Sequence, residues 1–335
     1  MKDSTEEPEA QMPASQLRWV AISLAVLLVL GACSPADEAG GGSIRLYTSV
    51  TQGTVDAVVE AFAKDHPGVK VGVFRAPTGE LTARIAAEQR EGGIQADLIW
   101  LTDPLSMQQY DADGLLQDYI PAAVEQIPPE FRSARFWGTR LLSMVIVQRA
   151  GLSPGATGWA DLADPGLARV AIPDPGFAGS ALGAMAYLAM ADGFGFDFYA
   201  RMAANGGVQV NSPGDVVTGV AEGRFAAGMT LAFSARAAID KGSPIEIVWP
   251  EPGGIVMYSP IAIFTSAADP SAAERFVDFV LSLEGQEAIA ETGWQPVRDD
   301  VAWETGGGHI VTPSWPDVFN RQDELLDDYR EIFGG

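Results

Sequence analysis

The spacing of apolar residues predicts alternating strands and helices over the first part of the chain. Residues 44–47 form a short apolar run, and valines alternate with other residues over 69–73, as in half-buried strands. Between them, residues 54–65 carry valine and phenylalanine at the spacing of one helix face. A second helix is predicted over 78–91, and the unbroken apolar run 97–101 indicates a strand buried on both faces. This alternation predicts an α/β sheet.

A second series of the same kind begins after residue 147. Short apolar runs predict strands, and amphipathic segments predict helices between them; the strands are 169–172, 208–210, 225–230 and 245–248, and the helices are 181–191, 215–222 and 233–241. A turn-rich break at 249–254 precedes a further strand over 255–264. The sequence Ser-Ala-Ala-Glu at 271–274 has the pattern of a capping box and predicts a helix start there.

The N-terminal region carries an apolar segment over 19–30, followed by Gly31, Ala32 and the single cysteine, Cys33. The segment is shorter than the roughly 18–20 residues of a membrane-spanning helix and has the length of a signal-peptide core. It resembles the bacterial lipobox, which implies a lipoprotein signal peptide over 1–32 and lipidation of Cys33. An uncleaved anchor is the alternative, and translation from Met12 would remove the unusual acidic start. Residues 33–42 predict a flexible tether.

Composition and charge exclude several classes of protein. The 335 residues include 21 Lys and Arg against 44 Asp and Glu, a formal net charge of −23, so a generally basic nucleic-acid binder is excluded. One cysteine rules out an intrachain disulfide, and two histidines, His66 and His309, give little material for a metal cluster. No phosphate-binding loop, nucleophile elbow or zinc-protease motif is present. No cofactor and no metal are therefore expected.

Six segments, taken in order, carry a family resemblance. They are SIRLYTS at 43–49, VVEAFAKDHPGVKV at 58–71, ADLIW at 96–100, IPDPGFAGSA at 172–181, GIVMYSPIAI at 254–263 and AERFVDFVLSLEGQ at 273–286. Together they resemble the solute-binding proteins of ABC transporters, and most of all the ferric-iron-type branch. Relatives in that branch also carry phosphate esters, phosphonates, thiamine or polyamines.

The resemblance implies an α/β, two-lobed periplasmic-binding-protein-like fold of type II, with a hinge of two crossing strands near 142–147 and 254–259. Lobe 1 is expected to comprise 43–145 and 256–290, and lobe 2 is expected to comprise 146–255 and 291–335. Ligand would bind in the cleft between the lobes, and closure would be a hinge motion.

The resemblance also implies candidate ligand-binding positions. Thr51 stands where ferric binders place a histidine, and Thr102 and Asp103 stand where they place an acid. The tyrosine pair that holds iron is matched by Phe233 and Ser234, and phenylalanine cannot supply the hard donor that Fe³⁺ needs. A bare ferric ion is therefore disfavoured.

An anion loop is better matched. Gly179, Ser180 and Ala181 at a helix start offer backbone N–H groups, although an ordinary helix cap has the same residues. Asn211, at the end of a second-lobe strand, matches another ligand position of the family. Thr48, Ser49 and Thr51 precede the first helix and are equally compatible with plain loop residues.

Four functions remain open from the sequence. The first is a lipid-anchored, extracytoplasmic and monomeric receptor that delivers a small organic or phosphate-type anion to an ABC permease. The second is a receptor for a cationic solute (an iron complex, thiamine or polyamine) held by Asp103, Trp100 and Phe233. The third is an extracytoplasmic enzyme, which lacks a candidate histidine base. The fourth is a sensor partner without a ligand. A bulky acid at Ser180 is expected to abolish anion binding and to spare cation binding.

Overall fold

The computed structural model describes residues 42–167, 169–303 and 307–334. The predicted signal peptide, Cys33 and residues 33–41 of the predicted tether lie outside the described residues. Gly42, the last residue assigned to the tether, already belongs to the first strand.

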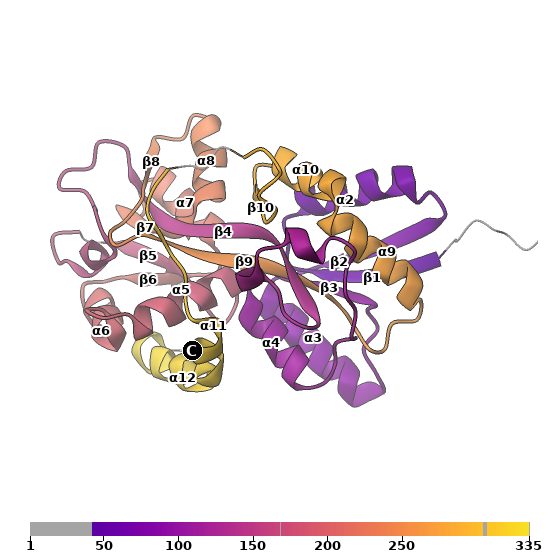
Figure 1. Cartoon of the computed structure of the whole chain (residues 1–335). Coiled ribbons are helices and arrows are strands. Elements are labelled where there is room, and N and C mark those ends of the chain that lie inside the picture. The colour runs from indigo at the N-terminus through magenta and orange to yellow at the C-terminus, as the bar shows by residue number, and fades with distance from the viewer. Residues whose placement is uncertain (1–41, 168, 304–306, 335) are drawn as a thin grey trace, which may run out of the picture. The chain divides into compact units, whose positions relative to one another are not determined.

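The first lobe is built on three strands that run parallel to one another (Figure 1). Its strands are β1 (Gly42–Thr48), β2 (Val69–Arg75) and β3 (Leu98–Trp100). Its helices are α2 (Gln52–Asp65), α3 (Thr78–Glu91), α4 (Pro104–Ala112), α9 (Pro270–Leu281) and α10 (Leu283–Glu291), with short 3₁₀ turns η1 (Val124–Gln126) and η2 (Pro129–Phe131). The predicted strands and helices over 44–101 are confirmed.

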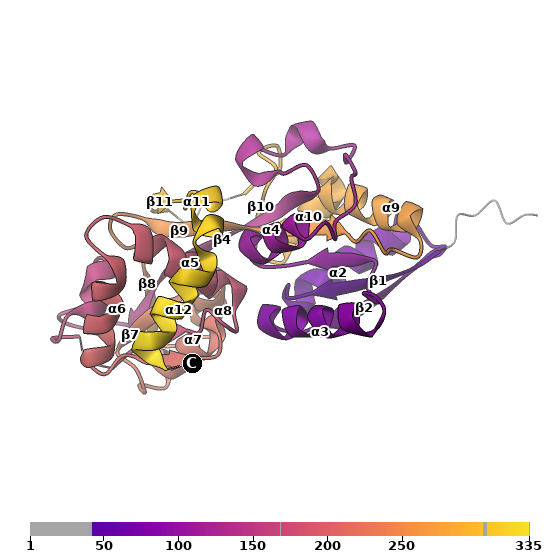
Figure 2. The same ribbon diagram turned by 90° about the horizontal axis from the view of Figure 1, so that it is seen from below.

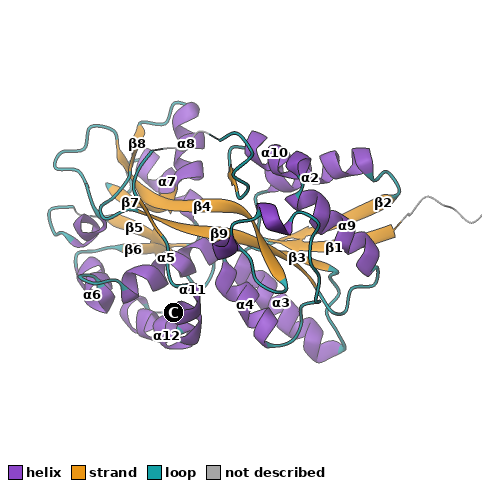
Figure 3. Ribbon diagram, viewed as in Figure 1, coloured by secondary structure: helices purple, strands orange, loops and turns teal. Residues whose placement is uncertain are grey.

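The second lobe repeats this arrangement. Its strands are β5 (Val170–Pro173), β6 (Val208–Val210), β7 (Ala227–Leu231) and β8 (Ile245–Val248). Its helices are α5 (Gly179–Met190), α6 (Gly195–Ala204), α7 (Pro213–Ala221), α8 (Ala232–Asp240) and the C-terminal α12 (Gln322–Phe333), with the 3₁₀ turn η3 (Trp159–Ala163). Strands β5, β6 and β7 are parallel, and helices cover both faces of the sheet (Figure 3). Figure 2 shows α12 beside α5 and α6.

Two long antiparallel strands join the lobes: β4 (Phe136–Arg149) and β9 (Gly254–Ile263). The sheet order is β2-β1-β3-β9-β4-β7-β5-β6, so β9 pairs with the first lobe and β4 with the second. Every residue of β9 is buried, as a strand between two layers of helices requires. The predicted hinge of two crossing strands is confirmed. Short strands β10 (Gln295–Pro296) and β11 (Ile310–Val311) and helix α11 (Trp315–Asn320) complete the chain.

The predicted start of α9 is wrong by a few residues. The helix begins at Pro270, and its N-cap is Asp269, whose carboxylate accepts a hydrogen bond from the Ala272 backbone N at 3.0 Å. Proline at the first helical position needs no N–H partner, and aspartate is a strong N-cap residue. The capping box at 271–274 is therefore replaced by an Asp-Pro start.

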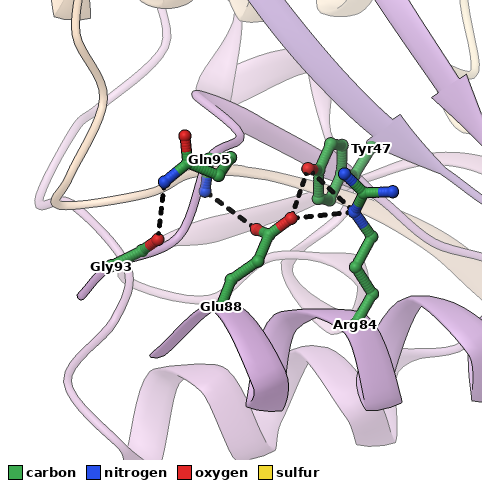
Figure 4. Close-up of polar contacts among 5 residues, drawn as sticks. All are labelled: Tyr47, Arg84, Glu88, Gly93 and Gln95. Atoms are coloured by element: carbon green, nitrogen blue, oxygen red, sulfur yellow. Dashed lines mark hydrogen bonds and ion pairs between the residues drawn. The ribbon is translucent and has the colours of Figure 1, made fainter. Parts of the chain in front are cut away.

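A polar network fixes α3 against β1 in the first lobe (Figure 4). Tyr47 Oη and Arg84 Nε both donate to Glu88 Oε1, at 2.7 and 2.8 Å, and the Gln95 backbone N donates to Glu88 Oε2 at 2.9 Å. Burial alone would raise the pKa of Glu88, but these hydrogen bonds outweigh it and hold the pKa below its usual value. The network holds the far end of a helix whose first residue, Thr78, faces the cleft.

Candidate functional site

A cavity of about 290 Å³ lies between the two lobes. In both lobes its walls come from the loops that follow parallel strands, which is where α/β sheets bind ligands. The first lobe contributes Ser49, Thr51, Arg75, Pro77, Thr78 and Thr102; the crossing strands and the β10 region contribute Arg140, Leu142 and Trp294; the second lobe contributes Phe177, Ala178, Gly179, Ser180, Ser212, Pro213, Gly214, Leu231 and Ser234.

Arg140, on β4, is the most unusual residue of this cavity. Its side chain is fully buried, yet Nε, Nη1 and Nη2 all lack a hydrogen-bond partner within the described part of the chain. Burial, with a smaller contribution from Coulombic repulsion by Arg75, lowers the pKa of Arg140 to about 9. Buried cations are normally paired, so a guanidinium in the cavity lining with no hydrogen-bond partner among the described residues is a candidate contact for a negative charge.

Arg75 adds a second positive charge to the same cavity. It ends strand β2, and its Nε donates to the Val50 carbonyl oxygen at 2.7 Å, which fixes the guanidinium beside the cleft. Among the described residues that line the cavity, Arg75 and Arg140 are the charged ones, and neither an aspartate nor a glutamate is among them. The site is thus positive although the protein carries a net charge of −23.

Hydroxyl groups cover the wall of the first lobe. Thr78 Oγ1 donates to Ser49 Oγ at 3.0 Å, and Ser49 Oγ lies 3.2 Å from Thr102 Oγ1. These three side chains come from the ends of β1 and β3 and from the start of α3. They offer several neutral donors and acceptors to the polar part of a solute.

The second lobe presents the N-termini of two helices. Helix α5 begins at Gly179, and its N-cap, Ala178, has no side chain that could accept a hydrogen bond from the first backbone N–H groups. Ser180 follows and is 4% exposed. Helix α7 is capped by Ser212, whose Oγ accepts from the Asp215 backbone N at 3.2 Å. Both helix dipoles favour a negative group at this wall.

Contacts between the lobes close the cleft beside the cavity. The Gly79 backbone N donates to the Phe177 carbonyl oxygen at 3.4 Å. Asp103 packs against Gly179 so closely that a methyl group at Gly179 would overlap Asp103 Oδ2 and would lie 2.9 Å from Thr78 Oγ1. The closed arrangement therefore depends on the absence of a side chain at Gly179.

The structure brings several of the predicted residues together at the cavity. They are Ser49, Thr51, Thr102, Gly179, Ser180 and Ser234. The predicted list omitted Arg75, Arg140 and Trp294. An arginine inside the apolar run 136–147 is the one sequence signal that would have drawn attention to Arg140, because a charge in a buried strand requires an explanation.

Other predicted residues lie outside the cavity lining. Thr48 is fully buried and donates to the Trp100 carbonyl oxygen at 2.7 Å. Trp100 is also buried, with its Nε1 donating to Thr139. Ala181 is buried inside α5, and Asn211 is exposed.

Asp103 and Phe233 lie next to the cavity rather than in its lining. Asp103 caps α4 by accepting from the Ser106 backbone N at 2.7 Å, and its other oxygen is buried without a partner in the described chain. Burial raises the pKa of Asp103. Phe233 stacks on Trp294 with ring centroids 4.0 Å apart.

Two further features bear on binding and attachment. In the described ranges, no group of three or more His, Cys, Asp or Glu side chains is placed to hold a metal ion. None of the helices in those ranges is long and apolar enough to cross a bilayer.

Solved structures share the fold. The periplasmic binding protein AfuA from Actinobacillus pleuropneumoniae, with fructose-6-phosphate bound, aligns with a TM-score of 0.78 over 87% of this chain and 98% of its own, at 21% identity. Iron-bound HitA from Pseudomonas aeruginosa aligns with a TM-score of 0.75 over 87% and 99% of the two chains, at 20% identity. At this level of identity, the likeness establishes the type II periplasmic-binding-protein fold.

Sequence comparisons give the family. An uncharacterized protein of Haemophilus influenzae is 27% identical over an alignment of 298 positions, which covers 83% of this chain and 84% of that protein. The spermidine/putrescine-binding periplasmic protein of Escherichia coli is 35% identical over 71 residues, 21% of this chain and 20% of its own. The family model of bacterial extracellular solute-binding proteins matches residues 44–295. The chain therefore belongs to the bacterial extracellular solute-binding proteins, the substrate-binding components of ABC import systems.

Proposed function

We propose that this solute-binding protein captures a small organic or phosphate-type anion in the cavity between its lobes and delivers it to an ABC permease. The observation that carries the proposal is Arg140, a buried guanidinium in the cavity lining that has no hydrogen-bond partner among the described residues. A bound anion would supply the missing negative charge, and charge-assisted hydrogen bonds to carboxylate or phosphate are the strongest that arginine makes.

The rest of the cavity supports the same class of ligand. Arg75 and the N-termini of α5 and α7 add positive potential, while Ser49, Thr78 and Thr102 add hydroxyls for polar substituents. The volume of about 290 Å³ is at the lower end of the range for small-molecule sites. A compact, highly polar solute fits these features better than a large apolar one.

A cationic solute is the second candidate, because a stretch of 71 residues is similar to a spermidine/putrescine-binding protein. Such a ligand needs acidic side chains in its pocket. Asp103 is the buried acid nearest the cavity, but it packs on Gly179 and caps α4. The two arginines would repel a cation, so the anion is favoured.

Thermal unfolding with a panel of solutes tests the proposal. An anion from a set containing inorganic phosphate, fructose 6-phosphate and succinate is expected to raise the Tm by about 4 °C at a concentration a hundredfold above Kd. Spermidine and thiamine are expected to leave the Tm unchanged. The control is Ser180→Glu, which places a negative charge at the helix start and is expected to remove the shift. A shift caused by spermidine that survives in Ser180→Glu would favour the cationic alternative.

We also propose that Cys33 anchors the protein to the membrane by a lipid. The support is the apolar segment 19–30 followed by small residues and the single cysteine. Expression of Cys33→Ser in a bacterial host is expected to move the protein from the membrane fraction to the soluble fraction and to abolish labelling by a radioactive fatty acid. Labelling of Cys33→Ser at the wild-type level would contradict the lipid anchor.

Three expectations remain predictions. The lobe boundaries are placed at 43–145 with 256–290, and at 146–255 with 291–335. The protein is expected to be a monomer, and nucleic acid is not expected as a partner.

A further inference from the structure

We infer that Trp294 positions Arg140 as a two-pronged receptor for the oxygens of a carboxylate or phosphate, by supporting the guanidinium on its ring face without using any of its N–H groups. This inference rests on the proposed function, since it concerns how the same cavity grips an anion. It adds a role for a tryptophan that contacts both lobes.

Trp294 lies between an aromatic ring and a guanidinium. The Trp294 ring lies nearly parallel to the Phe233 ring, at 16° and with a centroid separation of 4.0 Å. Arg140 Cζ lies 4.1 Å from the centroid of the same indole. Two groups this close to one ring centroid cannot share a face, so Phe233 and Arg140 occupy opposite faces of Trp294. The three side chains form a continuous stack from α8 to the crossing strand β4.

The stack explains how a buried arginine is held while its nitrogens stay unpaired. An acidic partner would neutralise Arg140, and backbone carbonyl groups would consume its donors. The N–H groups of a guanidinium lie in its own plane. A ring face 4.1 Å from Cζ is close enough for face-on stacking and leaves those groups to point sideways. All three nitrogens are buried without partners in the described chain, and the arginine lines the cavity.

Trp294 is itself fixed from the first lobe. Its Nε1 donates to Thr51 Oγ1 at 3.2 Å, and Thr51 Oγ1 lies 2.9 Å from Thr54 Oγ1. Thr54 Oγ1 in turn lies 3.0 Å from Thr292 Oγ1. The indole, 3% exposed, is thus held in its plane by a hydroxyl chain at the start of α2 and on one face by Phe233 of the second lobe.

Substitutions that separate the ring from the hydrogen bond test this role. The probe is whichever of inorganic phosphate, fructose 6-phosphate and succinate binds the wild-type protein most tightly, measured by calorimetry. Trp294→Leu removes the aromatic face and is expected to raise Kd about 10-fold. Trp294→Phe keeps an aromatic face and is expected to stay within about 3-fold of the wild-type Kd.

Fluorescence reports whether the anion binds beside the Trp294 indole. Binding of an anion at Arg140 changes the charge next to the indole, so the wild-type emission is expected to respond to the probe, and Trp294→Phe is expected to lose that response. Trp159→Phe is the matched control, because Trp159 is fully buried and its Nε1 donates to the Gly253 carbonyl oxygen. That variant is expected to keep the response.

The outcomes distinguish this inference from the proposed function. If none of the three anions binds the wild-type protein, the proposed function fails and this inference fails with it. If an anion binds and Arg140→Met loses it, but Trp294→Leu binds as tightly as the wild type, the role of Trp294 is wrong and the proposed function stands. If Trp294→Leu does not fold, an unchanged anion response in Trp294→Phe overturns the inference instead.

Discussion

Replacing Arg140 by methionine is expected to raise the Kd for the anion that the proposed function requires by roughly 30- to 5,000-fold. Removing one partner of a buried charged pair costs about 2–5 kcal/mol, and each 1.4 kcal/mol is a factor of ten in Kd. Arg140 lies in the cavity lining, and its three nitrogens have no hydrogen-bond partner within the described ranges, so under the proposed function the substitution would leave the bound anion without its counter-charge. Calorimetric titration with the anion found in the thermal panel measures the change.

The thermal stability of the unliganded Arg140→Met protein is expected not to fall, although its affinity for the anion does. In the unliganded protein, methionine fills a similar length with an apolar chain and removes a buried charge that has no hydrogen-bond partner in the described part of the chain. The Tm without ligand is therefore expected to equal or exceed that of the wild type, whereas a structural arginine would give a lower Tm. Arg140→Lys keeps the charge but loses the two-pronged geometry, and an intermediate Kd is expected. Wild-type affinity in Arg140→Met would show that the anion does not contact this residue.

Gly179→Ala is expected to weaken anion binding by roughly 5- to 150-fold without lowering the stability of the unliganded protein. The added methyl group would overlap Asp103 Oδ2 and press on Thr78 Oγ1, both from the opposite lobe. Overpacking of this kind costs about 1–3 kcal/mol, which falls on the closed state alone. Alanine suits a helix better than glycine, so the open state does not suffer. Calorimetry and thermal unfolding together measure both effects.

Gly53→Ala is the matched control for this substitution. Gly53 also lies in the first turn of a helix, α2, but a methyl group there would meet no atom within 4 Å. Its Kd is expected to remain at the wild-type value. Equal Kd values for Gly179→Ala and the wild type would mean that ligand binding does not require the Asp103–Gly179 contact between the lobes.

Much of the fold could be predicted from the sequence because the helices and strands form where the local apolar patterns predict them. The apolar periodicity over 54–65 and the strand 97–101 depend on neighbours in the chain, and α2 and β3 follow them. Candidate residues that follow parallel strands, such as Ser49 and Thr102, reach the cavity because parallel strands bring their carboxyl ends to one edge. This prediction requires only that the strands are identified and run parallel.

The charged centre of the site could not be predicted in the same way. Arg140 lies in the middle of β4, and its place on the cavity wall depends on pairing with residues more than a hundred positions away on β9. Trp294 meets Arg140 because β10 pairs with β4, a contact of two residues that no periodicity indicates. Asn211 shows the converse, since a residue at a strand end still points to solvent.

The buried guanidinium of Arg140 also bears on how far the cleft opens when no ligand is bound. In a closed cleft without ligand, the Arg140 guanidinium would be buried away from water and repelled by Arg75. An open cleft would let water hydrate it. We therefore expect the unliganded protein to favour an open cleft, so that a closed conformation marks the ligand-bound state for the permease. Arg140, on a strand that joins the two lobes, would thus couple ligand binding to closure of the cleft.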